Sequence, residues 1–235
     1  FAVKAGDAVR QGQALAVIRT GAEPNPPVDV ACFRAWSWVA GASSAGDVQQ
    51  SLVAHASWRP ALEAIRAGHA TWIALTGRSA DGDGSLGPEG LHIHPLIVED
   101  VFEDCPRPRV ENLDDYLYVQ VHAPSASSLT DANTELDLVE IDVLLGPNWV
   151  VTHCSKPSAA ISAVQEELRR SGRGLRKGAS WLAHLVIDRI VDDYVPLLDE
   201  FDQELARLED EVLDDTRDDV LPRIFVLKRR LQQLR

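Results

Sequence analysis

The chain has 235 residues, of which 45% are hydrophobic and 25% charged, the composition of a folded domain with a core of its own. Its formal net charge of −13 argues against a nucleic-acid partner, because phosphate binding requires clustered Lys and Arg. Three cysteines are too few for a disulfide framework, and no apolar run approaches the roughly 20 residues that span a bilayer.

The N-terminal part of the sequence alternates short apolar runs with turn residues. Residues 1–27 are predicted to form a small hairpin and a linker, because glycines separate two apolar runs and three prolines follow within four positions. Strands are predicted at residues 28–38 and 71–75, with a helix between them over residues 44–68. A glycine-rich loop is expected at residues 81–90.

The middle of the chain predicts one short helix and three strands. The helix covers residues 95–103 and begins at a proline, which suits the first helical turn. Alternating apolar residues predict strands at residues 116–122, 135–145 and 149–153, and Gly-Pro-Asn forms the turn before the last of them. Strands and helices mixed in this way indicate an α/β (α+β) class, with an α/β/α sandwich around a mixed sheet.

After residue 159 the pattern becomes helical and stays so. Helices are predicted at residues 159–170, 179–213 and 220–235, and a glycine- and arginine-rich loop at residues 172–178. Apolar residues recur at steps of three and four in the long helix, which indicates packing against another helix. That series is Leu198, Phe201, Leu205, Leu208 and Val212.

We therefore divide the chain into three parts: a hairpin and linker at residues 1–27, an α/β/α domain at 28–178, and a long acidic helix pair at 179–235. The chain contains no Met, and its last helix has no stop signal. We interpret the absence of Met as a sign of missing N-terminal sequence, and the absence of a stop signal as a sign that the sequence continues beyond residue 235.

Three segments carry a resemblance to a known family. HPLIVEDVFEDCPRPRVENLDDYLYV at residues 94–119 resembles the cytoplasmic domain of CorA-type magnesium/cobalt (divalent metal ion) transporters. The helical segment at residues 181–213 resembles the long helix of that family, and Leu-Lys-Arg at residues 227–229 resembles its next helix. The resemblance extends over about residues 28–235. The family's stalk helix, its two transmembrane helices and their Gly-Met-Asn signature are absent from the sequence.

The resemblance implies a cytoplasmic cation-sensing and gating domain of a magnesium (cobalt or nickel) transporter or channel. It also implies divalent cations as ligands, a homopentamer, and attachment to the cell inner membrane through missing C-terminal helices. Two alternatives stay open, namely a zinc transporter of the same superfamily and a stand-alone soluble regulatory metal-binding protein. No enzyme is predicted, since the sequence has no nucleophile elbow, phosphate-binding loop or dinucleotide fingerprint.

Paired carboxylates are the candidate cation ligands, because Mg²⁺ prefers carboxylate oxygens and keeps several of its waters. Glu99 and Asp100 are adjacent on the short predicted helix, and Asp188 and Asp192 lie four residues apart on one face of the long one. By resemblance, Glu99, Asp100 and Asp188 match the carboxylates that hold regulatory Mg²⁺ (or Co²⁺, Ni²⁺ or Zn²⁺) between subunits. His184 shares the face of Asp188. The plainer alternative is that these acids cap helices, form salt bridges or face solvent.

Other charged residues support weaker hypotheses. Residues 188–219 hold fourteen acids and three bases, which indicates a solvated acidic surface or a field that concentrates cations. Arg107 and Arg109 lie beside prolines and are expected to pair with acids. A structural zinc site has less support, because the histidines and cysteines lack the CxxC or HxxxH spacing of such sites. Its candidate ligands are His92, His94, Cys105, His153 and Cys154.

Overall fold

A computed structural model describes residues 32–39, 51–77, 85–87, 90–103, 105, 107–125, 136–213 and 220–234. At its centre is a seven-stranded sheet with the order β2-β1-β3-β7-β6-β5-β4. The strands are β1 (Cys32–Trp38), β2 (Leu52–His55), β3 (Ala70–Thr76), β4 (Arg109–Leu113), β5 (Tyr116–Pro124), β6 (Leu138–Leu145) and β7 (Trp149–Cys154). β3 and β7 are parallel and the other neighbours antiparallel, so the sheet is mixed, as predicted.

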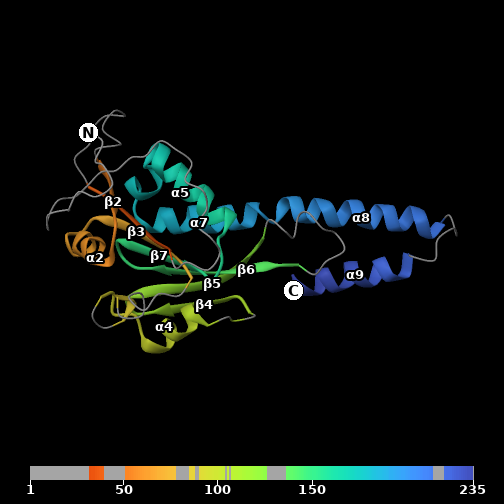
Figure 1. The fold of residues 1–235 in the computed structure, drawn as a ribbon, viewed down its shortest axis with the longest axis horizontal. Coiled ribbons are helices and arrows are strands. Elements are labelled where there is room, and N and C mark those ends of the chain that lie inside the picture. The colour runs from red at the N-terminus through yellow and green to blue at the C-terminus, as the bar shows by residue number, and fades with distance from the viewer. Residues whose placement is uncertain are drawn as a thin grey trace, which may run out of the picture.

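Helices cover both faces of the sheet, which confirms the predicted α/β/α arrangement (Figure 1). α5, α6 and α7 pack on one face around a core that includes Trp72, Leu182 and Val186. α2 and α4 pack on the other face, with Ile97 and Tyr118 in their core. The bounds of these helices are α2 (Trp58–Arg66), α4 (Pro95–Phe102), α5 (Ala159–Ser171), α6 (Arg173–Arg176) and α7 (Ala179–Asp192).

Local chemistry explains where the helices that matter for the site begin and end. α4 begins at a proline, and the Nδ1 atom of His94 accepts a hydrogen bond from the backbone N–H of Leu96 at 3.2 Å. α5 is capped by Ser158 and ends at Gly172, whose φ of 61° is the left-handed conformation that glycine adopts without strain.

The predicted single helix over residues 179–213 is wrong, because α7 ends at Asp192 and α8 (Val195–Leu213) begins after a turn. The physical reason is Pro196, which has no N–H to donate and disfavours helical geometry in the residue before it. The predicted helix over residues 44–68 is wrong in part, since its described portion holds strand β2 as well as α2. β4 was not predicted.

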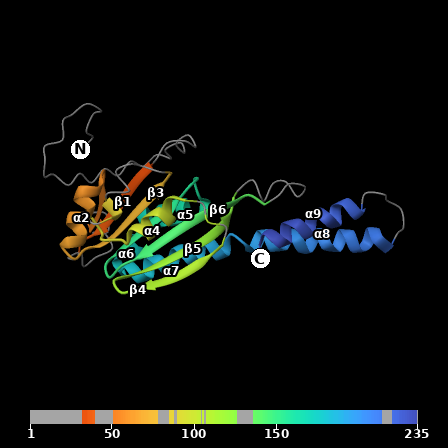
Figure 2. The same ribbon diagram turned by 90° about the horizontal axis from the view of Figure 1, so that it is seen from below.

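α8 and α9 (Val220–Gln233) form an antiparallel pair that extends away from the sandwich (Figure 2). Their shared core contains Leu197, Phe201, Leu208, Val220 and Leu227. The predicted division at residues 178 and 179 therefore differs from the packing, because α7 lies on the sheet and the separate pair begins with α8. The predicted hairpin at residues 1–27 lies outside the described residues.

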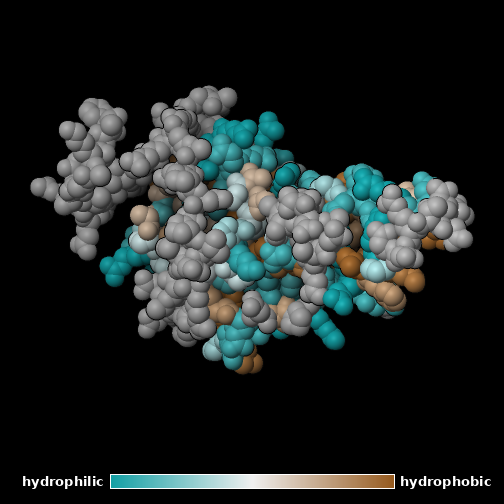
Figure 3. Space-filling model, turned by 45° about the vertical axis from the view of Figure 1, so that its right-hand side comes forward, coloured by the Kyte–Doolittle hydropathy of each residue, from teal (hydrophilic) through white to brown (hydrophobic). Residues whose placement is uncertain are grey.

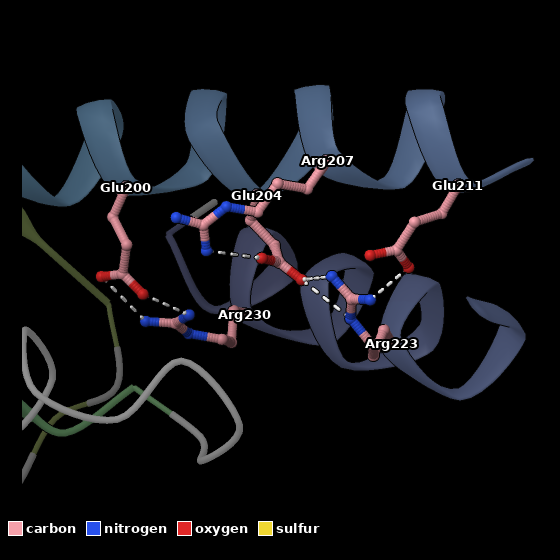
Figure 4. Close-up of polar contacts among 6 residues, drawn as sticks. All are labelled: Glu200, Glu204, Arg207, Glu211, Arg223 and Arg230. Carbon is pink, nitrogen blue, oxygen red and sulfur yellow. Dashed lines mark hydrogen bonds and ion pairs between the residues drawn. The ribbon is translucent and has the colours of Figure 1, made fainter. Parts of the chain in front are cut away.

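Ion pairs join α8 to α9 along the pair (Figure 4). Arg223 contacts Glu204 at 2.7 Å and Glu211 at 2.5 Å, and Arg230 contacts Glu200 at 2.9 Å. Two arginines of α9 thus form ion pairs with three acids of the predicted acidic surface. The outer sides of the pair carry apolar residues among the hydrophilic ones (Figure 3). Of the described helices, none has both the length and the hydropathy to cross a membrane.

Candidate cation site

α4 carries two of the four predicted ligands at its solvent side. Ile97 and Val101 are four residues apart and point into the core, which leaves Glu99 exposed and Asp100 half-buried. Asp100 forms an ion pair with Arg109 of β4, whose side chain is 29% exposed. Because the pair remains partly open to water, the carboxylate of Asp100 is accessible but has a competing cation beside it.

Arg109 connects Asp100 to a buried polar network beneath α4. Its guanidinium lies 5.1 Å from the ring centroid of Tyr118, and the Tyr118 hydroxyl donates a hydrogen bond to Asp142 Oδ1 at 2.8 Å. Burial, and then Asp142, raise the pKa of Tyr118. Burial alone would lower the pKa of Arg109, but its interactions with Tyr118 and Asp100 outweigh burial and raise it. The guanidinium beside Asp100 therefore stays charged at any ordinary pH.

α7 carries the other two predicted ligands. Val186 and Ile190 bury one side of the helix in the sheet, and Asp188 and Asp192 are exposed on its outer side. Both line a groove of about 670 Å³ between α5 and α7, together with Arg170, Arg173 and Arg189. Carboxylates and guanidinium groups thus share this groove, so a cation bound there would lie among mixed charges.

One chain does not bring the two carboxylate pairs together. α4 lies on one face of the sheet and α7 on the other, with the strands between them (Figure 1). Among the residues that the structure describes, no group of three or more His, Cys, Asp or Glu side chains could hold a metal ion. A site that uses both pairs would require two copies of the chain.

Three residues of the alternative zinc hypothesis lie apart from one another, in different surroundings. His94 caps α4, and His153 is buried against Asp142 at 3.1 Å. Cys154 lies in the core on the α7 side of the sheet. His184, which was expected beside Asp188, is exposed and packs edge-on against the ring of Trp181 at 5.6 Å.

Sequence reasoning anticipated that Arg109 pairs with an acid, and the ion pair with Asp100 confirms this. It missed the buried acids Glu140 and Asp142, which are 8% and 0% exposed. The two acids are two residues apart on a strand, so the sequence could have predicted that both side chains lie on one face of the sheet. Charged residues usually lie on the solvent side of a strand, so the same spacing would have predicted an exposed face, whereas both acids are buried.

Comparison with known proteins gives the family. Residues 68–235 match the family described as CorA-like Mg²⁺ transporter protein. The cobalt/magnesium transport protein CorA of Thermotoga maritima is 33% identical over 168 residues, which cover 70% of this chain and 46% of that protein. The magnesium transporter ALR1 of Saccharomyces cerevisiae is 24% identical over 150 residues, covering 64% of this chain and 17% of that protein.

Two solved structures share the fold. The soluble domain of CorA from Methanocaldococcus jannaschii has a TM-score of 0.54 at 19% identity and covers 69% of this chain and 63% of that one. The ZntB cytoplasmic domain from Vibrio parahaemolyticus has a TM-score of 0.53 at 18% identity, covering 69% and 65%. The chain spans about half the length of the Thermotoga maritima protein and less of the Saccharomyces cerevisiae one. From the family match over residues 68–235, the chain belongs to the CorA-like Mg²⁺ transporter family.

Proposed function

We propose that this chain is the cation-sensing and gating part of a divalent-cation transporter, and that Mg²⁺ is the ion it senses. Membership of the family supports transport, and a relative named as a cobalt/magnesium transport protein supports these ions. The observation that carries the sensing role is the outward placement of two carboxylate pairs on opposite faces of the sheet. In a ring of copies, the α4 face of one chain would meet the α7 face of the next.

The electrostatics of such a boundary favour a cation. Glu99 and Asp100 from one copy and Asp188 and Asp192 from another would repel each other across the boundary. A hydrated divalent ion supplies the positive charge that offsets this repulsion, and carboxylate oxygens are ligands that Mg²⁺ accepts. When cytoplasmic Mg²⁺ falls, the carboxylates would repel, the copies would loosen and the pore could open.

The whole protein would be a homopentamer attached to the cell inner membrane through helices outside this sequence, with this portion in the cytoplasm. Mg²⁺ fits the donor set better than Zn²⁺, because all four predicted ligands are carboxylates and Zn²⁺ prefers nitrogen and sulfur ligands. Co²⁺ and Ni²⁺ remain candidates beside Mg²⁺. A stand-alone metal-binding protein would use the same carboxylates without forming a ring that depends on the ion.

The sensing role is tested by titrating the chain with Mg²⁺, Co²⁺, Ni²⁺ and Zn²⁺ and following the backbone amides of α4 and α7 by NMR. Addition of Mg²⁺ should shift both sets of amides, and Glu99→Gln and Asp188→Asn should each weaken the response. The control Glu63→Gln changes an exposed acid on α2 and should titrate like the parent chain. If α4 and α7 do not respond to Mg²⁺, or if both variants titrate like the control, the sensing assignment is wrong.

A further inference from the structure

β6 presents two buried acids to the α4 side of the sheet, and each has a histidine from a neighbouring strand opposite it. Glu140 pairs in register with His122 of β5, and Asp142 pairs in register with His153 of β7. All four side chains are largely buried. Burying a carboxylate is unfavourable unless hydrogen bonds compensate, so the partners of these acids indicate what the arrangement holds in place.

Glu140 and His122 both form hydrogen bonds with the backbone of Cys105, which follows α4. The Cys105 N–H donates to Glu140 Oε2 at 2.7 Å, and His122 Nε2 donates to the Cys105 carbonyl oxygen at 3.1 Å. His122 Nε2 also lies 3.8 Å from Glu140 Oε2. Both polar groups of the Cys105 backbone are thus held by side chains from two strands. We call these three residues the Cys105 clamp.

The second pair supports the last residue of α4. His153 Nδ1 lies 3.1 Å from Asp142 Oδ2, and the ring of Phe102 packs edge-on against His153 with 5.1 Å between centroids. Phe102 at the end of α4 and Cys105 after it therefore contact two neighbouring acid–histidine pairs. Glu99 and Asp100 lie within the last turn of this helix, so a change at the Cys105 clamp reaches them through a few residues of backbone.

We propose that Glu140 and His122 are positioning residues for α4, and that proton uptake by Glu140 loosens the Cys105 clamp and weakens cation binding at Glu99 and Asp100. The proton comes from solvent and binds the Glu140 carboxylate. The hydrogen bond from Cys105 then changes from a charge-assisted bond to a neutral one, which is roughly half as strong. The inference rests on the proposed function for its cation-binding part only.

The surroundings of Glu140 set the direction of this response. Burial raises its pKa, and the hydrogen bond from the Cys105 backbone and the nearby Gln120 side chain lower it by less. The titratable groups that face it are Asp142 on its own strand, which raises the pKa, and His122 on β5, which lowers it. Because the net shift is upward, Glu140 takes up its proton at a higher pH than an exposed glutamate does. The clamp therefore loosens as the pH falls, and it does so at a higher pH than the titration of an exposed glutamate would allow.

The clamp is tested first without any cation, by hydrogen exchange of the Cys105 amide measured by NMR. Between about pH 7.5 and about pH 4, the protection factor should fall several-fold, up to about tenfold, the effect of weakening one charge-assisted hydrogen bond by about half. Glu140→Gln should show the low value at both pH values, and Glu63→Gln should behave like the parent chain. Circular dichroism melting confirms that each variant is folded. A protection factor that stays constant with pH in the parent chain overturns the proposal.

A pair of histidine variants separates positioning from general packing. His122→Gln keeps a side-chain N–H that reaches the Cys105 carbonyl, so it should retain most of the protection at neutral pH. His122→Ala removes that donor and should lose several-fold of the protection. Equal protection in the two variants would mean that His122 does not act through this hydrogen bond.

The cation arm compares Mg²⁺ titrations of α4 amides at the same two pH values. The midpoint should rise more between neutral and low pH in the parent chain than in Glu140→Gln, where only the ligands themselves titrate. Equal pH dependence in the two proteins overturns the positioning role. If Mg²⁺ leaves α4 unchanged even at neutral pH while Cys105 protection still depends on pH, the proposed sensing function fails and the clamp stands.

Discussion

The ion pair between Arg109 and Asp100 predicts that removing the arginine strengthens cation binding. In Arg109→Gln, the Asp100 carboxylate no longer has to leave a guanidinium before it can approach Mg²⁺. The two side chains are 29% and 35% exposed, so the pair is worth about 0.5–1 kcal/mol, the range of partly solvated ion pairs. Loss of that competition should lower the Mg²⁺ midpoint by roughly two- to fivefold.

The assay is the NMR titration of α4 amides with Mg²⁺ at neutral pH and low salt, because screening by salt reduces the effect of partly exposed charges. Arg107→Gln is the matched control, since it removes the same charge from an exposed position two residues away. It should change the midpoint by less than Arg109→Gln. If Arg109→Gln binds Mg²⁺ equally or more weakly while remaining folded, Asp100 is not a ligand that the arginine restrains.

Three further predictions concern stability and reactivity. Arg230 is 1% exposed and forms an ion pair with Glu200, so Arg230→Ala should lower the free energy of unfolding by about 3 kcal/mol in urea titrations. An unchanged urea midpoint would contradict this. In Gly146→Ala the new methyl would lie 2.1 Å from the ring of Trp149, so unfolding should become easier by about 2 kcal/mol, whereas wild-type stability would show that the turn can adjust. Burial raises the pKa of the Cys154 thiol, so at about pH 8 a thiol reagent should modify it only after unfolding; rapid modification of the native chain would refute its burial.

The sandwich could be predicted from sequence because β3, β6 and β7 are short apolar runs, and because α4 and α5 carry capping residues. The two short strands were missed because each depends on pairing with a neighbouring strand. β4 contains Glu111 and Asn112, which hide its alternation, and it forms because β5 offers a complete antiparallel partner. β2 is a four-residue segment whose structure depends on pairing with β1 and not on its own propensity.

The side of α8 that faces α9 could not be predicted from the apolar residues. α8 carries two apolar series that share Phe201 and Leu208, which are buried, whereas Leu198 and Leu205 of the predicted series are 51% and 49% exposed. The buried series begins at Leu197. Both series have helical spacing, so the apolar residues alone do not decide which one faces α9. Glu200 and Glu204 decide it, because their pairing with Arg230 and Arg223 fixes the rotation of the helix.

The sequence indicated four candidate ligands but not how they are arranged in space. Helical spacing placed Asp188 and Asp192 on one outer face of α7, and the structure agrees. The sequence did not indicate that α4 and α7 lie on opposite faces of the sheet, because the order of strands follows from pairing between distant segments. That arrangement is why a shared cation would require two copies.

Mixing two complementary variants tests the shared site most directly. One variant carries Glu99→Gln and Asp100→Asn, the other Asp188→Asn and Asp192→Asn, and Mg²⁺-dependent association is measured by sedimentation velocity. Neither variant alone should associate with Mg²⁺ as the parent chain does. An equimolar mixture should regain association, because the α4 face of the second variant meets the α7 face of the first with all four carboxylates intact. A mixture that behaves like its separate components, or either variant associating like the parent chain, would contradict a cation held between two chains.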